Sequence, residues 1–412
     1  MVYRRHTNFS LESIEQTFNG TVGFGRKVTC TVSRNGDLLT KAYLKVTLPG
    51  IRDTGSAATG KGATRWADHV GHRLIKYVEV EIGGQRIDKH YGEWLHIWNE
   101  LTQTAGHAIG YNRMIGHHPA FQTPVVEGAD ECVPSQTMYI PLQFWFNRNP
   151  GLALPLIALQ YHEVKFNFEF ATASEVCPGS ASEPSVAIEG DLQASLYVDY
   201  VYLDADERKR FAQVTHEYLI EQLQFTGSES IPPTADNGNH KAKLNFNHPV
   251  KELIWTVKAN NAVPANQLAY DNMPFDYSLG SSTPASGAIV GAGGNNAAMV
   301  DLLYGRKNPV KTGLLQLNGH DRFSQRDGMY FNVVQPFQHH ENCPATGINV
   351  YSFALKPEEH QPSGSCNMSR IDNAVLNLGL ESMTAGAQVS IYATNYNVLR
   401  ILSGMGGLAY AS

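Results

Sequence analysis

The chain has 412 residues, 17% of them charged, and a formal net charge of −6 at pH 7. This length is too great for one typical hydrophobic core and suits two domains of about 200 residues each. The only basic clusters near the start are Arg4-Arg5 and Arg26-Lys27. They are too few to neutralise the ~6–10 phosphates of a nucleic-acid footprint, which excludes a basic-armed protein that packages nucleic acid.

The cysteines and the apolar segments bear on the compartment. The five cysteines are scattered and form no C-x-x-C motif, so we expect free thiols in a reducing compartment. The first residues contain no apolar stretch typical of a secretory signal. The longest apolar run, residues 151–159, is interrupted by Pro155 and has half the ~20 residues that a membrane-spanning helix needs. We therefore expect a soluble chain.

The first half of the chain predicts mainly strands. Residues 1–28 are expected to form an N-terminal arm with one short helical or extended piece at 9–18. Strands are expected at 28–33 and 38–48, and the Asn35-Gly36 turn between them indicates a hairpin. The next expected elements are a small-residue loop, a short amphipathic helix, a strand and a second helix, at residues 53–64, 66–76, 77–82 and 93–104.

The segments up to the middle of the chain continue this pattern. A polar connection reaches residue 135, and strands are expected at 138–146, 161–170 and 187–203. In the segment 161–170, alternation places Val164, Phe166, Phe168 and Phe170 on one face. The charged stretch 204–211 predicts a helical linker and is the best domain boundary.

The second half predicts more strands and long loops. Residues 226–241 and 278–298 are rich in Gly, Ser, Pro and Asn, so we expect loops, the second at an exposed tip. The apolar, Gly-rich end of the chain, 395–412, is expected to pack against the protein. Strands dominate, and turn signals recur about every 10 residues, as in sandwiches and jelly rolls.

Three segments of the first half recur in the same order in the second. VEVEIGGQRIDKHYGEWLHIW (78–98) and GLLQLNGHDRFSQRDGMYFNVV (313–334) each combine an alternating strand, a tight turn, a charged stretch and an aromatic-rich run. SLYVDYVYL (195–203) matches SIYATNYNV (390–398), and AYLKVTLPG (42–50) more weakly matches ELIWTVKAN (252–260). We therefore predict two copies of one all-β unit, with an arm at 1–28 and domains at 29–212 and 213–412.

Motifs that could carry chemistry are incomplete. Residues 55–61 fit G-x-x-x-x-G-K, but Gly62 stands where a phosphate-binding loop needs Ser or Thr. His162-Glu163 and His216-Glu217 begin like H-E-x-x-H and lack the second histidine. We therefore predict no catalytic, cofactor-binding or metal-binding residues.

Other patterns have ordinary explanations. The adjacent histidines His117-His118 and His339-His340 would point to opposite faces of a strand and chelate poorly. The three N-x-S/T sequons matter only on a secretory route. The aromatics that could form a sugar platform more often belong to a core. The sequons start at Asn8, Asn19 and Asn367, and the aromatics are Trp94, Trp98, Trp145 and Phe146.

Several long segments resemble the major capsid proteins of nucleocytoplasmic large DNA viruses. They are NFSLESIEQTFNG (8–20), EIGGQRIDKHYGEWLHIWNELT (81–102), YIPLQFWFNRNPGLALPLIALQYHEVKFNFEF (139–170), INVYSFALKPEEHQPSGSCNMSRIDNA (348–374) and the end of the chain. The resemblance implies a double jelly roll of two tandem eight-stranded sandwiches that trimerises into a capsomer. It also implies an icosahedral shell over an inner membrane, assembled in the host cytoplasm.

The implied partners are other copies of the chain, neighbouring capsomers, and minor capsid and penton proteins, with no direct binding of nucleic acid. We expect residues 1–20 to reach beneath the sandwiches toward neighbours, and the loops at 53–64, 226–241 and 278–298 to face outward. Several relatives have large insertions in their outward loops, whereas the corresponding loops of this chain are short. Two other functions stay open: a two-domain jelly-roll enzyme, cupin-like or glycan-cleaving, and a carbohydrate-binding protein. A penton or spike component, expected to have one jelly roll, fits the duplication poorly.

Overall fold

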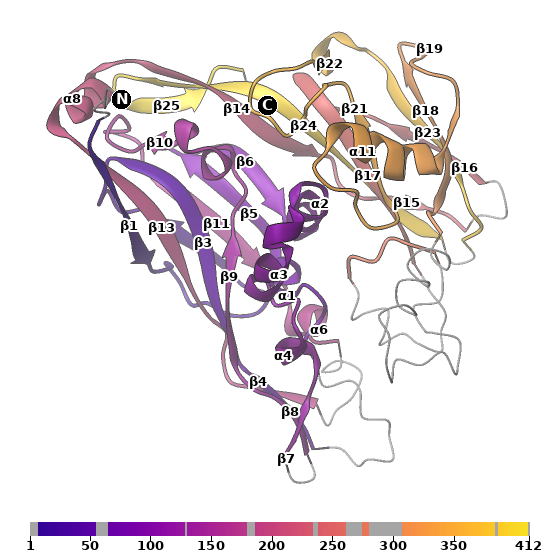
Figure 1. Ribbon diagram of the computed structural model, residues 1–412, viewed down its shortest axis with the longest axis horizontal. Helices are drawn as coiled ribbons and strands as arrows, with labels where there is room; N and C mark the ends of the chain where they lie inside the picture. The colour runs from indigo at the N-terminus through magenta and orange to yellow at the C-terminus, as the bar shows by residue number, and fades with distance from the viewer. Residues whose placement is uncertain are drawn as a thin grey trace, which may run out of the picture. The chain divides into compact units, whose positions relative to one another are not determined.

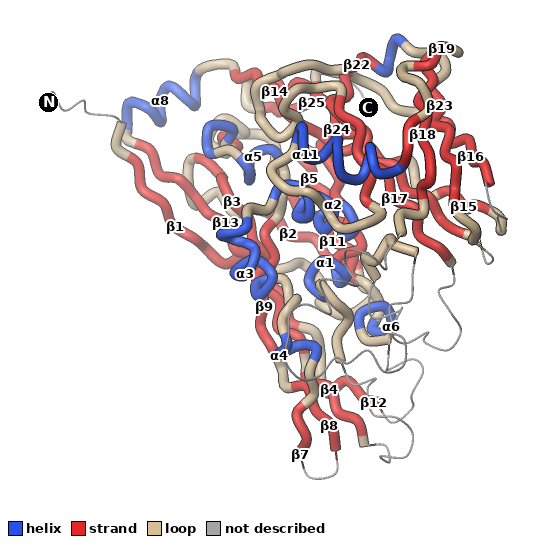
Figure 2. Tube along the Cα trace, turned by 45° about the vertical axis from the view of Figure 1, so that its right-hand side comes forward, coloured by secondary structure: helices blue, strands red, loops and turns tan. Residues whose placement is uncertain are grey.

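The computed structural model describes residues 7–54, 65–127, 130–178, 186–233, 238–260, 274–279, 307–383 and 386–410. Strands are the main secondary structure of this described chain, and its helices are short (Figure 2). The all-β class expected from the alternating segments is therefore confirmed. Among the described residues, no helix has the length and apolar character needed to cross a membrane.

The chain forms two compact units that are not continuous in sequence. The first contains Met1–Leu95, Ile109–Gln222 and Tyr396–Ser412, and the second contains His96–Ala108 and Leu223–Asn395. Each unit thus includes a segment from the other half of the chain.

The first unit contains two antiparallel sheets (Figure 1). One has the order β1 (Phe9–Gln16), β13 (Gln193–Leu203), β3 (Leu38–Leu48) and β10 (Leu154–Pro155), with β9 (Gln136–Pro141) also paired to β3. The other has the order β2 (Lys27–Thr31), β11 (Val164–Phe170), β5 (Ile75–Ile82) and β6 (Gln85–Tyr91). A small extra sheet joins β12 (Val186–Glu189), β4 (Gly50–Asp53), β8 (Asp130–Val133) and β7 (Val125–Glu127).

The second unit repeats the two-sheet arrangement. One sheet has the order β14 (His216–Phe225), β24 (Ala387–Leu402), β17 (Pro249–Ala259) and β21 (Ile348–Ser352), with β15 (Glu229–Ile231), β22 (Cys366–Asn367) and β25 (Met405–Leu408) at its margins. Most of β14, the end of β24 and all of β25 belong to the first unit. The other has the order β16 (Gly238–Lys243), β23 (Ala374–Leu380), β18 (Val310–Leu317) and β19 (His320–Asp321), with β20 (Arg326–Asp327) also paired to β18.

The two strand orders correspond position by position. β13 pairs with β3 in the first unit as β24 pairs with β17 in the second, and these strands contain the repeated segments. Likewise β11 lies between β2 and β5, as β23 lies between β16 and β18. The duplication predicted from the sequence echo is therefore present in the pairing of the strands.

The two matching hairpins also share their turn. Gly83 and Gly84 connect β5 to β6 with φ of 59° and 84°, and Asn318 and Gly319 connect β18 to β19 with φ of 51° and 81°. Two successive positive φ angles define the two-residue turn that fits the twist of a hairpin, and they favour Gly and Asn. These predicted turns are confirmed.

A helical segment follows each hairpin. In the first copy it is α2 (Gly92–Thr102), as the apolar spacing predicts. In the second copy it is a π-helical turn, η4 (Tyr330–Val334), continued by α11 (Gln335–His339). The charged linker forms α8 (Ala205–Gln213), and the Asp204 side chain accepts a hydrogen bond from the backbone N–H of Ala205. The other helices are α1 (Val70–Leu74), α3 (Ala105–Met114), α4 (Pro119–Gln122), α5 (Trp145–Arg148), η2 (Pro150–Leu152), α6 (Ala173–Val176) and η5 (Met368–Arg370).

Alternation along the strands builds the core of each unit. On β11, Val164, Phe166, Phe168 and Phe170 are buried while the residues between them are partly exposed, as predicted. In the second unit, Trp255 and Phe331 lie 5.2 Å apart, ring centre to ring centre, within the apolar core.

The extended piece expected at 9–18 is present as β1, which pairs with β13 along its whole length. Other expectations about segments are wrong. The strands on either side of Asn35-Gly36 do not form a hairpin, because β2 and β3 belong to different sheets. The expected loop at 226–241 contains β15 and most of β16. The polar connection before residue 135 contains α3, α4, β7 and β8.

Candidate functional site: a buried ion network and an exposed apolar face

Two adjacent charged residues of β17 lie in the interior of the second unit. β17 is a central strand, paired with β21 on one side and β24 on the other. Its register with β24 shifts between Val250 and Glu252, which makes Lys251 the extra residue of a bulge. The side chains of Lys251 and Glu252 are both fully buried. Buried charges need partners, because an unpaired one costs several kcal/mol.

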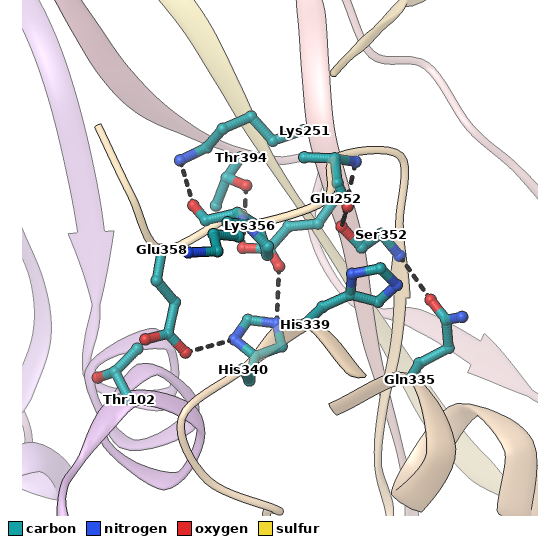
Figure 3. A network of polar contacts seen from close by, with 12 residues as sticks. Thr102, Lys251, Glu252, Gln335, His339, His340, Ser352, Lys356, Glu358 and Thr394 are labelled. Carbon is teal, nitrogen blue, oxygen red and sulfur yellow. Dashed lines mark hydrogen bonds and ion pairs between the residues drawn. The ribbon is translucent and has the colours of Figure 1, made fainter. Parts of the chain in front are cut away.

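Glu252 finds its main partner in His340, at the end of α11 (Figure 3). Glu252 Oε2 lies 2.9 Å from His340 Nε2, and Glu252 Oε1 accepts a hydrogen bond from the Thr394 hydroxyl at 3.1 Å. On the other side of the imidazole, His340 Nδ1 lies 2.7 Å from Glu358 Oε1. Both ring nitrogens of His340 therefore face carboxylates.

This arrangement fixes the charge of the imidazole. Burial alone would lower the pKa of His340, but the nearby carboxylates of Glu252 and Glu358 outweigh it and raise this pKa to about 9. Burial also favours the neutral form of Glu252, yet His340 and Lys251 hold the pKa of that carboxyl below its ordinary value. At neutral pH the network is an imidazolium between two carboxylates.

The network ties a long connection to the sheet. Lys251 Nζ donates a hydrogen bond to the Pro357 carbonyl at 2.6 Å, and Glu358 Oε1 also accepts one from the Glu341 N–H at 3.0 Å. Nearby, the Gln335 side chain accepts a hydrogen bond from the Ser352 N–H at 3.0 Å. These contacts join α11, β17 and the segment after β21. Chemically the network is suited to holding structure, since its charges are paired with one another and removed from water.

The other singled-out histidines lie apart and bind protein groups. His339 Nδ1 donates to the Leu355 carbonyl at 2.9 Å, which separates it from the ion pair of His340. His118 caps α4, His162 Nδ1 lies 3.0 Å from the Gly406 carbonyl, and His216 Nε2 donates to the Phe211 carbonyl at 2.7 Å.

The remaining predicted features are also located. Trp94, Trp98, Trp145 and Phe146 are buried, as the core interpretation predicts. The Asn367 side chain caps η5, which gives it a local structural role. Cys30, Cys343 and Cys366 are free thiols, and of these Cys343 is exposed. The G-x-x-x-x-G-K segment and nearly all of the 53–64 and 278–298 loops lie outside the described residues.

An exposed apolar face on η4 and α11 was not found from the sequence. Met329, Val333 and Phe337 are exposed and follow one another at intervals of four residues, which places them on one side of a helix. Leu355 is also exposed, and its carbonyl accepts a hydrogen bond from the side chain of His339, two residues after Phe337. The spacing of four was visible in the sequence and is the signal that could have revealed this face.

Comparison with known proteins identifies the family. A family model described as "Major capsid protein N-terminus" matches residues 1–204, and one described as "Large eukaryotic DNA virus major capsid protein" matches residues 207–407. The major capsid protein of Pyramimonas orientalis virus is 53% identical over 435 residues, which cover 100% of this chain and 93% of that protein. This chain belongs to the major capsid proteins of large eukaryotic DNA viruses.

Further capsid proteins agree in sequence and in fold. The major capsid protein of Paramecium bursaria Chlorella virus 1 is 44% identical, covering 100% of this chain and 93% of that protein. The crystal structure of PBCV-1 VP54, fitted into a reconstruction of the virophage Sputnik, superposes with a TM-score of 0.78 at 41% identity and covers 100% of this chain and 99% of that one. The Faustovirus major capsid protein shares the fold at 13% identity, with a TM-score of 0.74, covering 97% of this chain and 92% of that one. The predicted double jelly roll is confirmed, and the protein is a structural component of a viral capsid.

Proposed function

We propose that this major capsid protein forms a homotrimer whose six sandwiches make a pseudo-hexagonal capsomer that tiles an icosahedral shell. The observation that carries the proposal is the repeated strand order of the two units. A trimer has only three-fold symmetry, but two similar sandwiches per chain give it six similar corners. A relative 40% identical in sequence is part of the quasi-atomic model of the PBCV-1 virus capsid, which supports the proposal.

Cyclic assembly requires two complementary faces on each chain, and the two copies of the sandwich offer them side by side in sequence. Permanent interfaces of this kind bury about 2,000 Å² or more and are apolar. The exposed apolar face on η4 and α11 supplies part of such a surface. In the shell, the partners would be neighbouring capsomers and minor capsid and penton proteins.

We propose that the shell lies above an inner membrane and that it assembles in the host cytoplasm. The net charge of −6 and the scarcity of basic clusters support a chain that does not bind the genome directly. We assign no catalytic, cofactor-binding or metal-binding residues.

The mass of the purified protein in solution tests the proposal. Three chains of 45.4 kDa give about 136 kDa, and negative-stain images should show six-sided particles. A stable monomer at micromolar concentration would contradict the trimer. Stoichiometric zinc, iron or manganese in the protein would instead favour a jelly-roll enzyme, and glycan binding by a monomer would favour a carbohydrate-binding protein.

A further inference from the structure

The helical segment after the second hairpin exposes more apolar surface than a structural role within one chain explains. Met329 is 64% exposed, Val333 38%, Phe337 77% and Leu355 72%. We call these four residues the α11 face. Together they expose roughly 450 Å² of apolar surface, near the upper end for a monomer and about half of what one partner contributes to a standard interface. A surface of this size is therefore suited to contact with another protein chain.

The equivalent helix of the first copy has a protein partner. The C-terminal part of α2 belongs to the second compact unit, together with the segment that follows α11. There the Asn342 backbone N–H donates to the Leu101 carbonyl at 3.0 Å, and the Asn342 side chain donates to the Glu100 carbonyl at 3.0 Å. The Ala345 N–H donates to the Glu100 carboxylate at 3.2 Å. In short, the helix of copy one is held by the segment after the helix of copy two.

The segment after the helix of copy one is α3, and it has no buried residue. Ala105, Ala108 and Ile109 share one side of this helix, and Ile109 is 86% exposed. α3 contains Arg113 and no acidic residue, while the exposed residues that flank the α11 face in sequence have both signs, Asp327 and Glu341 with Arg326 and Lys356. The two surfaces therefore match in apolar character.

We propose that the α11 face of one chain packs against α3 of a second copy of this chain. Within one chain, the helix of copy one contacts the segment after the helix of copy two. In the proposed contact between chains, the helix of copy two contacts the segment after the helix of copy one. Around the three-fold axis of the proposed trimer, the two alternating contacts would close a ring of three chains. The inference rests on the proposed trimer and specifies which surfaces hold it together.

Charge substitutions on the two surfaces test the contact. Phe337→Glu and Ile109→Glu should each convert the 136 kDa species into a folded 45.4 kDa monomer that keeps a cooperative thermal transition, because both side chains are exposed within the chain. The thermal midpoint should fall only by the contribution of the lost association. Met405→Glu, at an exposed apolar residue of the β24–β25 hairpin, is the matched control and should leave the trimer intact. If Phe337→Glu stays trimeric, the inference fails and the proposed trimer stands. A monomeric wild-type protein would instead refute the trimer itself.

The native thiol of Cys343 gives a second readout that needs no disruptive variant. Its sulfur lies 4.0 Å from the Val333 carbonyl oxygen, next to the α11 face. Maleimide should label this thiol at least about tenfold more slowly in the wild-type trimer than in the Phe337→Glu monomer, because a thiol covered by a partner is not accessible. Equal labelling rates in trimer and monomer would place the contact elsewhere.

Disulfide cross-linking identifies the partner surface directly. In a Cys343→Ser background, the pair Ile109→Cys and Phe337→Cys should give covalent dimers and trimers on oxidation, since a disulfide forms only where Cβ atoms come within about 4.5 Å. Each single cysteine variant should stay a monomer on a non-reducing gel. Failure of the pair to cross-link in an intact trimer would rule out α3 as the partner.

Discussion

At the scale of single residues, His340 stabilises the second unit through its contacts with the carboxylates of Glu252 and Glu358. Replacing it by Gln would leave Glu252 buried beside Lys251 without its main partner. Loss of one member of a buried pair costs about 3–5 kcal/mol, so we expect His340→Gln to lower the free energy of unfolding by that order at pH 6. Urea unfolding measures the change. Lys356→Gln, which removes an exposed pair with Glu359, is the control and should leave the free energy of unfolding nearly unchanged.

The pair of His340 and Glu252 predicts how the free energy of unfolding depends on pH. The folded-state pKa of His340, about 9, lies above its unfolded value of 6.5, so its contribution is fully present below pH 6.5 and is lost as the pH rises toward 9. The difference between wild type and His340→Gln should therefore narrow over this window. A difference that is constant from pH 6.5 to 9 would mean that His340 is neutral in the fold. The sequence showed His339-His340-Glu341 but not the partners, because Glu252 and Glu358 are distant in the chain.

Gly36 was singled out from the sequence for a hairpin turn, but the structure requires a glycine there for another reason. Asn35-Gly36 predicted a hairpin, but Gly36 has no positive φ. A Cβ at Gly36 would instead lie 2.6 Å from the Cβ of Tyr200, whose hydroxyl donates to the Ser33 carbonyl at 2.7 Å. The glycine is needed because a buried ring from β13 approaches the turn, which no local pattern reveals.

Replacing this glycine by alanine should therefore destabilise the first unit. We expect Gly36→Ala to cost about 1–3 kcal/mol, because Tyr200 is buried and cannot move away freely. Gly106→Ala is the matched control, since a Cβ there meets nothing within 4 Å on α3, and it should be neutral or stabilise by up to about 1 kcal/mol. Thermal unfolding compares the two, and an equal effect of both would refute the close approach.

At the scale of elements, prediction succeeded where local geometry demands particular residues. Both hairpin turns need positive φ and were found from Gly83-Gly84 and Asn318-Gly319. The strand β11 was found because its buried phenylalanines alternate. β1 was missed as part of the sheet because its residues are almost all exposed, so the pairing with β13 leaves no hydrophobic pattern in the sequence.

β1 should therefore be essential to the first unit. Deleting residues 1–16 would remove the whole strand and the Gln16 side chain, which accepts a hydrogen bond from the Ser33 N–H at 3.3 Å. β13 would then lose one of its two neighbours and present an open edge, which favours aggregation. We expect a lower soluble yield and a lower thermal midpoint than for a deletion of residues 1–6, which keeps β1. Equal stability of the two deletions would show that the first unit does not need the pairing of β1 with β13.

At the scale of the whole molecule, the duplication was readable from the sequence, but the exchange of segments between the two units was not. The second unit includes His96–Ala108, and the first includes Tyr396–Ser412. In the first unit, Asn397 donates to the Gln222 side chain at 2.9 Å, and the Tyr161 N–H donates to the Gly404 carbonyl at 3.0 Å. Such contacts join residues far apart in the chain, so local patterns cannot predict them.

The exchange predicts what happens when the chain is divided at the sequence-predicted boundary, into residues 1–212 and 213–412. The first piece loses β25 and the end of β24, and the second loses α2 with its Glu100 contacts to Asn342 and Ala345. Each piece would also expose apolar core residues that the missing segment covers. We therefore expect neither piece to give a cooperative unfolding transition when expressed alone, whereas coexpression should restore a soluble complex. Two separately folded halves, each with its own sharp thermal transition, would instead support two autonomous domains at 29–212 and 213–412.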